Sequence, residues 1–434
     1  MHNPQEIRKR PAFWPKSGWG RFQEYASLVH EIVLDPFVGT VDTPLRSKAW
    51  QDDFWCRLSS IVGNTPILPN LRAASLLAAI SFKHRPFDTG VLRLLNPSIR
   101  ELNVALPRAG TEDEVKVRTA LSECLSSFQN LEVLSIEMPL PPPDLGSLVQ
   151  SHPHLHYLRL DNNFQVNSDH LTHLAALRRL EYLSVDLDPT APLNVPVAFA
   201  RLRILSVHSN EFDAICALVA YMAAPRLQTL SISESHLYSS KMCTEMQTIL
   251  RTVVGKCPFL TAFEWESRHH HRRTDAALAE LIDPLLSHPT LRSFSARFDD
   301  LIVRYTPADF RAMAEAWPDL ETFHLHDGGW RHTNQYANLE SVLAFARGCP
   351  RLRSLHIPDV EFDLDSIQAA VKGSQGSTAP HGLRDLRVTR SVGCLEQPED
   401  SEEDAEGLRA EATRLFRRWV LENVFPFVMI HVPC

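Results

Sequence analysis

The sequence repeats one short apolar pattern along most of its length. "CPRLRSLHIPD" at 349–359 has the same outline as "HPHLHYLRLDN" at 152–162, "APRLQTLSISE" at 224–234 and "WPDLETFHLHD" at 317–327. Each copy holds an apolar residue, two variable residues, a second apolar residue, one variable residue and a third apolar residue. The clear copies begin 22 to 33 residues apart, an interval typical of arrays in which similar units stack. The pattern therefore favours one elongated array over several ordinary domains.

Eleven copies are clear, and each contributes three apolar anchors. Their anchors are Ile99/Leu102/Val104, Leu131/Leu134/Ile136, Leu155/Leu158/Leu160, Leu180/Leu183/Val185, Leu202/Leu205/Val207, Leu227/Leu230/Ile232, Leu260/Phe263/Trp265, Leu291/Phe294/Ala296, Leu320/Phe323/Leu325, Leu352/Leu355/Ile357 and Leu383/Leu386/Val388. Weaker copies are Val29/Ile32/Leu34, Leu71/Ala74/Leu76 and Phe427/Ile430/Val432.

Each copy predicts a strand, and the segments between copies predict helices. The last two anchors of a copy are two residues apart, so they point to the same side of a β-strand. "NEFDAICALVAYMAA" at 210–224 has apolar residues at helical spacing behind Asn210, which we predict to be the N-cap. "DAALAELIDPLLSH" reads similarly, although we expect Pro284 to kink or divide that helix.

Proline stands two residues before the first anchor in eight copies. At this position we expect it to stop the preceding helix and to favour an extended approach to the strand. These prolines are Pro69, Pro97, Pro153, Pro225, Pro258, Pro289, Pro318 and Pro350.

The units resemble leucine-rich repeats of the helix-backed kind. We therefore predict an α/β leucine-rich-repeat solenoid, with a curved parallel β-sheet on the concave side and helices on the convex side. Residues 1–28 are predicted to form an N-terminal cap or a partly mobile segment, and residues 29–434 the solenoid. An acidic loop is expected at about 391–407, followed by a final helix in "EGLRAEATRLFRRWVLENVF" and a closing strand in "FVMIHV".

Composition excludes several classes of partner. The chain has 44 Lys and Arg residues against 52 Asp and Glu, a net charge of −8, so it lacks the basic excess of a general nucleic-acid binder. No apolar run approaches the ~18 residues that a membrane helix needs. The eight cysteines are scattered without paired metal-ligand spacing, which indicates reduced and mostly buried thiols. We expect a monomer in the cytoplasm or nucleus that binds neither nucleic acid nor membrane.

The strong catalytic patterns are absent from the sequence. It contains no Gly-rich phosphate loop, no GxSxG elbow, no HExxH and no Walker sequence. We therefore expect no enzymatic activity, no catalytic residue and no cofactor.

Positions three, five and seven of each copy alternate with the buried anchors and should line the concave face. From them we select partner-binding candidates: Glu137, Tyr157, Arg159, Asp161, Tyr182, Asp186, Glu264, Glu266, Arg297, His324, His326 and His356. Exposed tyrosines among carboxylates suit recognition of a basic peptide or protein surface. An ordinary solvated face is the alternative.

Three of these candidates are histidines that the register should bring together. His324 and His326 lie two apart on one strand, and His356 takes the position beside His324 on the next. Three imidazoles could hold Zn²⁺ with an open fourth position, which would suit a zinc-dependent hydrolase. Solvated surface histidines are far commoner, so we assign no metal ligand.

A narrower resemblance covers the chain from about residue 19 to its end. "WGRFQEYASLVHEIVLD" at 19–35, "LPNLRAASLL" and "NPSIRELNV" resemble the opening of fungal F-box leucine-rich-repeat proteins. In that family an N-terminal F-box docks the Skp adaptor of a cullin-based ubiquitin ligase, and the repeats capture the protein to be ubiquitylated. The resemblance implies partner capture by the repeats and transfers no catalytic residue.

The chain departs from that family before Val29. No stretch there has the Leu-Pro start, paired helices and Trp-ended finish of an F-box, so a contact with the Skp adaptor is doubtful. Either the chain is shortened, or the protein retains the repeats without the ligase. We expect a non-catalytic protein-interaction scaffold that binds another protein on the concave face. A leucine-rich-repeat regulator or inhibitor unrelated to ubiquitin fits the repeats equally well.

Overall fold

The structure is a computed structural model. It describes residues 16–34, 66–77, 89–105, 111–137, 145–190, 193–234, 242–267, 275–298, 302–327, 337–362, 382–393, 414 and 429–431. The chain divides into two compact units, Met1–Asp186 and Leu187–Cys434. Both units are built from parallel strands and helices in alternation.

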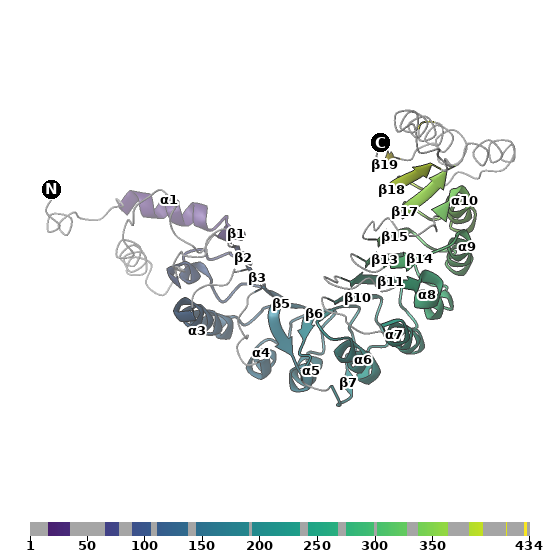
Figure 1. Cartoon of the computed structure of the whole chain (residues 1–434). Coiled ribbons are helices and arrows are strands. Elements are labelled where there is room, and N and C mark those ends of the chain that lie inside the picture. Colours follow the sequence, from purple (N-terminus) through teal and green to yellow (C-terminus); the bar gives the residue numbers. More distant parts are fainter. Residues whose placement is uncertain are drawn as a thin grey trace. The chain divides into compact units, whose positions relative to one another are not determined.

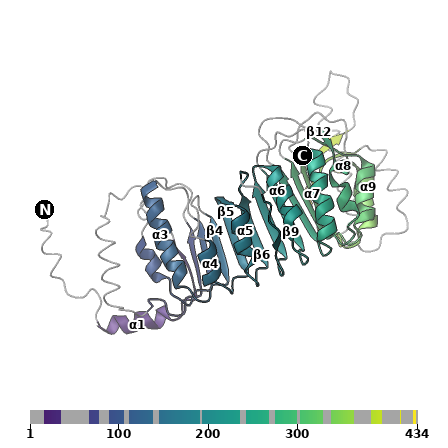
Figure 2. The same cartoon turned by 90° about the horizontal axis from the view of Figure 1, so that it is seen from below.

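The first unit stacks its strands in chain order, from β1 to β6. The strands are β1 (Glu31–Leu34), β2 (Ala73–Leu77), β3 (Glu101–Ala105), β4 (Val133–Glu137), β5 (Tyr157–Val166) and β6 (Tyr182–Leu187). Its helices are α1 (Lys16–Ala26), the 3-10 helix η2 (Thr89–Leu94), α3 (Thr111–Ser127), α4 (Leu145–Ser151) and α5 (Ser168–Ala175). In Figure 2, α3, α4 and α5 lie next to one another along one face of the strands.

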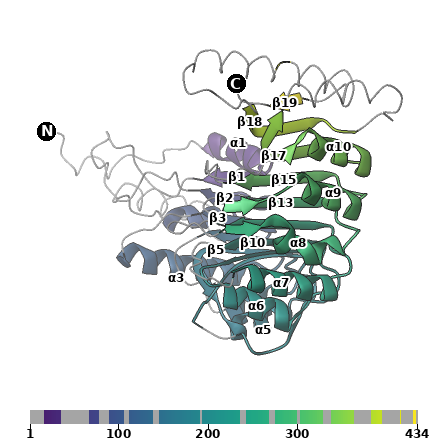
Figure 3. The same cartoon turned by 45° about the vertical axis from the view of Figure 1, so that its right-hand side comes forward.

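The second unit repeats this alternation of parallel strands and helices. Its strand order is β8 (Ile204–Ser209), β10 (Thr229–Glu234), β11 (Ala262–Ser267), β13 (Ser293–Phe298), β15 (Thr322–Asp327), β17 (Ser354–Phe362), β18 (Asp385–Gly393) and β19 (Met429–His431). The helices between them are α6 (Phe212–Tyr221), α7 (Met242–Lys256), α8 (Leu278–Leu286), α9 (Pro307–Ala316) and α10 (Leu339–Gly348). Figures 1 and 3 show these five helices on the same side of the unit's strands.

Short strands add to the second unit outside this succession. β7 (Val197–Ala198) pairs with β9 (Met222–Ala223), and β12 (Asp275–Ala277) pairs with β14 (Ile302–Arg304). β16 (Ala337–Asn338) extends the main sheet beside β17.

The predicted anchors form the core. All three anchors of all eleven clear copies are buried, and Leu158, Leu205 and Leu355 each expose no more than 1% of their surface. Neighbouring copies pair in parallel with their anchors in register, as Leu102 does with Leu134 and Leu134 with Leu158. The prediction of one buried face per strand is therefore confirmed. The fold is α/β with a large parallel sheet.

The weaker copies differ among themselves. Leu71, Ala74 and Leu76 are buried, whereas Val29, Ile32 and Leu34 are half-buried. The last copy falls outside the described residues except for the backbone of Ile430 in β19. Among the described strands β1 has a partner on one side only, so its anchors have less apolar surface from these strands to pack against.

The prediction for the eight prolines before the anchors is confirmed in part. α4, α7, α8, α9 and α10 each end two or three residues before such a proline, but the expected extended approach is not formed. In each case the proline is the second residue of a four-residue turn, and the amide of the first anchor donates to the carbonyl three residues earlier. Leu260 N–H, for example, donates to Cys257 O at 3.1 Å around Pro258. Proline suits this position because its ring fixes the backbone angle that the turn requires. The prolines thus shape a closed turn and not an extended approach.

One predicted helix start is wrong by one residue, and one predicted division of a helix does not occur. α6 begins one residue later than expected, with Glu211 and not Asn210 at the N-cap, and Glu211 makes no capping hydrogen bond through its side chain. Pro284 lies inside α8 without dividing it. Proline leaves the carbonyl four residues earlier without its amide donor, and Gln247 Nε2 of α7 donates to that carbonyl, Glu280 O, at 2.8 Å. A neighbouring helix thereby replaces the lost hydrogen bond.

The predicted terminal segments are only partly described. Residues 16–26 of the expected N-terminal segment form α1, and residues 1–15 lie outside the described part. Residues 391–393, at the approximate start of the predicted acidic loop, belong to β18, and the rest of that loop is outside the description. Of the predicted final helix only Arg414 is described, and it is helical.

The described cysteines are free thiols. Cys257 and Cys349 are buried, while Cys124 and Cys216 are half-buried. Burial raises the pKa of Cys349 to about 12 and that of each of the other three to about 11, so these four thiols stay protonated at neutral pH. No described helix has the length and apolar character required to cross a membrane.

Candidate interaction surface

The candidates in the first unit occupy the strand face opposite α3, α4 and α5. This tyrosine patch consists of Glu137 on β4, Tyr157, Arg159 and Asp161 on β5, and Tyr182 and Asp186 on β6. The parallel register places Glu137 beside Asp161 on the neighbouring strand. The first unit therefore brings its six candidates together on three adjacent strands.

The two tyrosines form one aromatic stack. Their ring centroids lie 4.0 Å apart, and the rings are nearly parallel at 9°. Both residues are half-buried. Burial and hydrogen bonding with Tyr182 raise the pKa of Tyr157 to about 12, so its hydroxyl keeps its proton across the physiological range. The stack presents a rigid aromatic edge with polar ends.

We predicted that Asp161 faces solvent, but it is buried. Only 8% of its surface is exposed, because both carboxylate oxygens are engaged by neighbouring side chains. Arg159 Nε donates to Asp161 Oδ2, and Ser184 Oγ donates to Asp161 Oδ1 at 2.9 Å. A buried carboxylate is stable when its acceptors are satisfied in this way. Asp161 thus positions Arg159 and is not itself an open contact.

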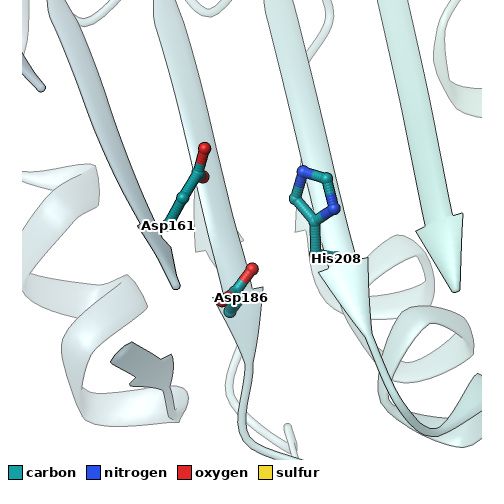
Figure 4. A group of neighbouring side chains, drawn as sticks. All are labelled: Asp161, Asp186 and His208. Atoms are coloured by element: carbon teal, nitrogen blue, oxygen red, sulfur yellow. The ribbon is translucent and has the colours of Figure 1, made fainter. Parts of the chain in front are cut away.

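Asp186 lies close to Asp161 across the strand pair. Figure 4 shows the two aspartates on neighbouring strands, and each offers a carboxylate oxygen within 4.8 Å of the other. His208, also labelled in Figure 4, belongs to β8 of the second unit. Asp186 and Glu137 are both half-buried. The end of the tyrosine patch that holds Glu137, Asp161 and Asp186 is consequently acidic.

The candidates in the second unit form the histidine patch. It consists of Glu264 and Glu266 on β11, Arg297 on β13, His324 and His326 on β15, and His356 on β17. One register row joins Glu266, Arg297 and His326, and Arg297 Nε lies 4.0 Å from Glu266 Oε1. Glu264 and Arg297 are exposed, and the other four are half-buried.

The three imidazoles cluster as the register predicts. His324 pairs with His356 across β15 and β17, and the ring centroids of His326 and His356 are 4.0 Å apart. The centroid of His324 lies 6.2 Å from that of His356 and 6.4 Å from that of His326. Nε2 of His324 is 2.8 Å from Ser354 Oγ.

His324 and His356 favour the neutral form. Burial, followed by repulsion from His326, His324 and Arg387, lowers the pKa of His356 to about 4. Burial also lowers the pKa of His324, with His326 and Arg387 adding to the effect and Asp385 opposing it. At neutral pH His324 and His356 are therefore uncharged imidazoles that can donate and accept hydrogen bonds.

Three neighbours of the patches were missed by the sequence reasoning. Asp385 and Arg387 on β18 extend the histidine patch, and Arg387 Nε donates to Asp385 Oδ2 at 3.0 Å. Ser184 holds Asp161 in the tyrosine patch. All three occupy positions three or five of their copies, so the same register rule identifies them when it is applied to every copy.

Comparisons with known proteins provide no family assignment. No family model matches the chain, and no curated protein matches it.

Proposed function

We propose that this protein is a leucine-rich-repeat solenoid that acts as a non-catalytic protein-interaction scaffold. In this proposal the strand faces that carry the tyrosine patch and the histidine patch bind another protein, in the manner of the substrate-recognition repeats of an F-box ubiquitin-ligase adaptor. The protein acts as a monomer in the cytoplasm or nucleus.

The observation that carries the proposal is the division of each strand into two chemically different faces. Every clear copy buries its three anchors, while the alternate positions hold tyrosines, charged residues and imidazoles. Helices occupy the buried side in each unit (Figure 1). Tyrosine and arginine are the residues most enriched at protein interfaces, and they occur together in the tyrosine patch.

A regulator or inhibitor unrelated to ubiquitin would use the same surface. The two versions differ in the proteins that accompany the chain in its cell. Co-purification of a Skp-type adaptor and a cullin is expected only for the ligase version, and a partner without them is expected for the regulator.

Affinity purification of the full chain from its own cell tests the proposal. We expect specific partners with the wild-type chain, and loss of at least one of them when Tyr157, Arg159, Tyr182 and Asp186 are changed together to Ala. A second variant with His324, His326 and His356 changed to Gln tests the histidine patch separately. Each truncation at an interface centre typically costs more than about 1 kcal/mol of binding energy. The four substitutions together should therefore abolish recovery of the partner.

The matched control changes exposed residues on the helices. Asp213 of α6, Arg311 of α9 and Glu315 of α9 are exposed, and changing them to Ala should leave recovery intact. If both strand-face variants retained every partner while the helix variant lost them, the binding face would be the helical one and the proposal would be wrong.

A further inference from the structure

A row of four register-matched residues crosses the first unit beside the tyrosine stack. Glu101 on β3 pairs with Val133 on β4, Val133 pairs with Tyr157 on β5, and Tyr157 stacks on Tyr182 of β6. Glu101 is exposed, and Val133 and Tyr157 are half-buried. The row therefore has a carboxylate at one end, a short aliphatic side chain in the middle and an aromatic ring at the other end.

Only the short side chain of Val133 stands between Glu101 and Tyr157 in this row. Tyr182 covers one face of the Tyr157 ring, whereas the neighbour on the other side is Val133, whose side chain is much shorter than a tyrosine ring. Adjacent strands lie about 4.8 Å apart, so Glu101 and Tyr157, two strands apart, are separated by roughly 10 Å at the backbone. A planar group about 3.5 Å thick fits between a ring face and a carboxylate at this separation.

Charge selects the kind of group that fits. The strand-face positions of β3 to β6 carry four carboxylates, Glu101, Glu137, Asp161 and Asp186, against the one guanidinium of Arg159, a formal charge of −3. Arg159 is itself paired with Asp161. A cation is attracted both to the carboxylate of Glu101 and to the face of an aromatic ring.

We infer that the space between Glu101 and Tyr157, above Val133, binds an arginine side chain from an extended basic segment of a partner protein. The planar guanidinium stacks on the Tyr157 ring and pairs with the Glu101 carboxylate, which a compact ammonium group does less well. This inference rests on the proposed function and names the chemistry of its partner.

The register also predicts a spacing within the partner segment. Glu137 and Asp186 occupy the seventh positions of their copies, four residues beyond the third-position row of Glu101 and Tyr157. Four strand residues span about 13 Å. A partner segment running along the strands in an extended conformation would therefore carry a second basic residue four positions from the arginine.

Fluorescence anisotropy with short labelled peptides tests the inference on the full chain. The probe is a nine-residue Gly/Ser peptide with arginine at positions three and seven. Its counterparts carry lysine, citrulline or glutamate there. We expect the arginine peptide to bind about tenfold more tightly than the citrulline peptide, which has the same shape without charge, and about threefold more tightly than the lysine peptide. The glutamate peptide should not bind.

Variants locate the site on the chain. Glu101→Gln and Tyr157→Leu should each weaken binding of the arginine peptide about fivefold to tenfold, and Tyr157→Phe, which keeps the ring, should stay within about twofold of wild type. The matched control is Glu315→Gln, which neutralises an exposed carboxylate of α9 outside both patches and should change nothing. Thermal unfolding of each variant checks that the fold is retained, and Glu101→Gln serves as the decisive variant if Tyr157→Leu unfolds.

Several outcomes would overturn the inference. They are equal binding of the arginine and citrulline peptides, an equal loss with Glu315→Gln and Glu101→Gln, and no binding of the arginine peptide to wild type at millimolar concentration. If strand-face substitutions abolish partner recovery from cells while the peptide test fails, the proposed function stands and this inference falls. If the peptides bind as expected while strand-face substitutions leave every cellular partner in place, the proposed function falls instead.

Discussion

At the scale of single residues, the strand-face histidines show how position in the register determines side-chain chemistry. His324 and His356 are one full copy of the repeat apart in the sequence, yet the parallel pairing of β15 and β17 places them side by side. Burial lowers the pKa of both His324 and His356, repulsion from His326 adds to the effect in each case, and Arg387 adds positive charge from the next strand. Clustering therefore disfavours protonation of the very groups that an isolated histidine would protonate near pH 6.5.

The lowered pKa values predict that acid destabilises this unit. In the folded chain His356 has a pKa of about 4, below the ordinary 6.5 of an unfolded chain. Between these two values the unfolded state binds more protons, so the contribution to stability is complete above pH 6.5 and is lost as pH falls toward 4. Urea unfolding midpoints measured at pH 7.5, 5.5 and 4.5 should fall with pH in the wild-type chain.

Replacing the clustered histidine isolates its share of this effect. His356→Gln should flatten the fall in the urea midpoint between pH 7.5 and 4.5, because glutamine has no proton to gain. The control, His173→Gln, changes an exposed histidine of α5 and should leave the pH dependence as in wild type. The same slope in His356→Gln as in wild type would contradict the assignment.

At the scale of elements, the packing of helix on helix decides details that local sequence patterns do not encode. Pro284 indicates a broken helix when α8 is considered alone, and the helix survives because Gln247 of α7 donates to the carbonyl that lacks its amide partner. The two residues are 37 positions apart, so no local pattern links them. The apolar periodicity, by contrast, is a local consequence of one buried face, and it predicted α6 to within about one residue of its start.

The close approach of α10 to α9 at Gly348 gives a test at this scale. A Cβ atom added at Gly348 of α10 would lie 2.7 Å from the backbone oxygen of Ala314 in α9. Because a backbone oxygen cannot rotate away, Gly348→Ala must push the helices apart, and we expect it to lower the free energy of unfolding by about 1–3 kcal/mol.

A second glycine provides the matched control. A Cβ added at Gly255 of α7 meets nothing within 4 Å, and alanine is the better helix former. Gly255→Ala should therefore raise the free energy of unfolding by up to about 1 kcal/mol. Urea or thermal unfolding of both variants measures the difference, and a destabilisation of equal size in the two would show that α9 and α10 are not closely packed at Gly348.

At the scale of the whole molecule, the repeat is the feature that sequence alone resolves best. Three apolar anchors per copy, at fixed offsets, predicted which 33 side chains of the clear copies would be buried, and all of them are. The exposed positions follow from the same alternation. Their interactions do not, because Asp161 became buried through two side chains, Arg159 and Ser184, whose conformations no register rule specifies.

The eight prolines show a similar limit to what the sequence alone can predict. Their spacing before each anchor is visible in the sequence, but the turn they form depends on a hydrogen bond between the first anchor's amide and the carbonyl three residues earlier. The pattern identifies where each strand begins, and the geometry of the turn explains why the spacing is constant across the copies.

The most direct test of the account is a carboxylate footprint of the full chain bound to its purified cellular partner. Carbodiimide labelling followed by mass spectrometry reports the exposure of each acidic side chain. The account predicts that partner binding protects Glu101, Glu137 or Glu264 on the strand faces, while Asp213, Glu280 and Glu315 on the helices label as in the free chain. Protection of the helix carboxylates with unchanged labelling on the strand faces would contradict it.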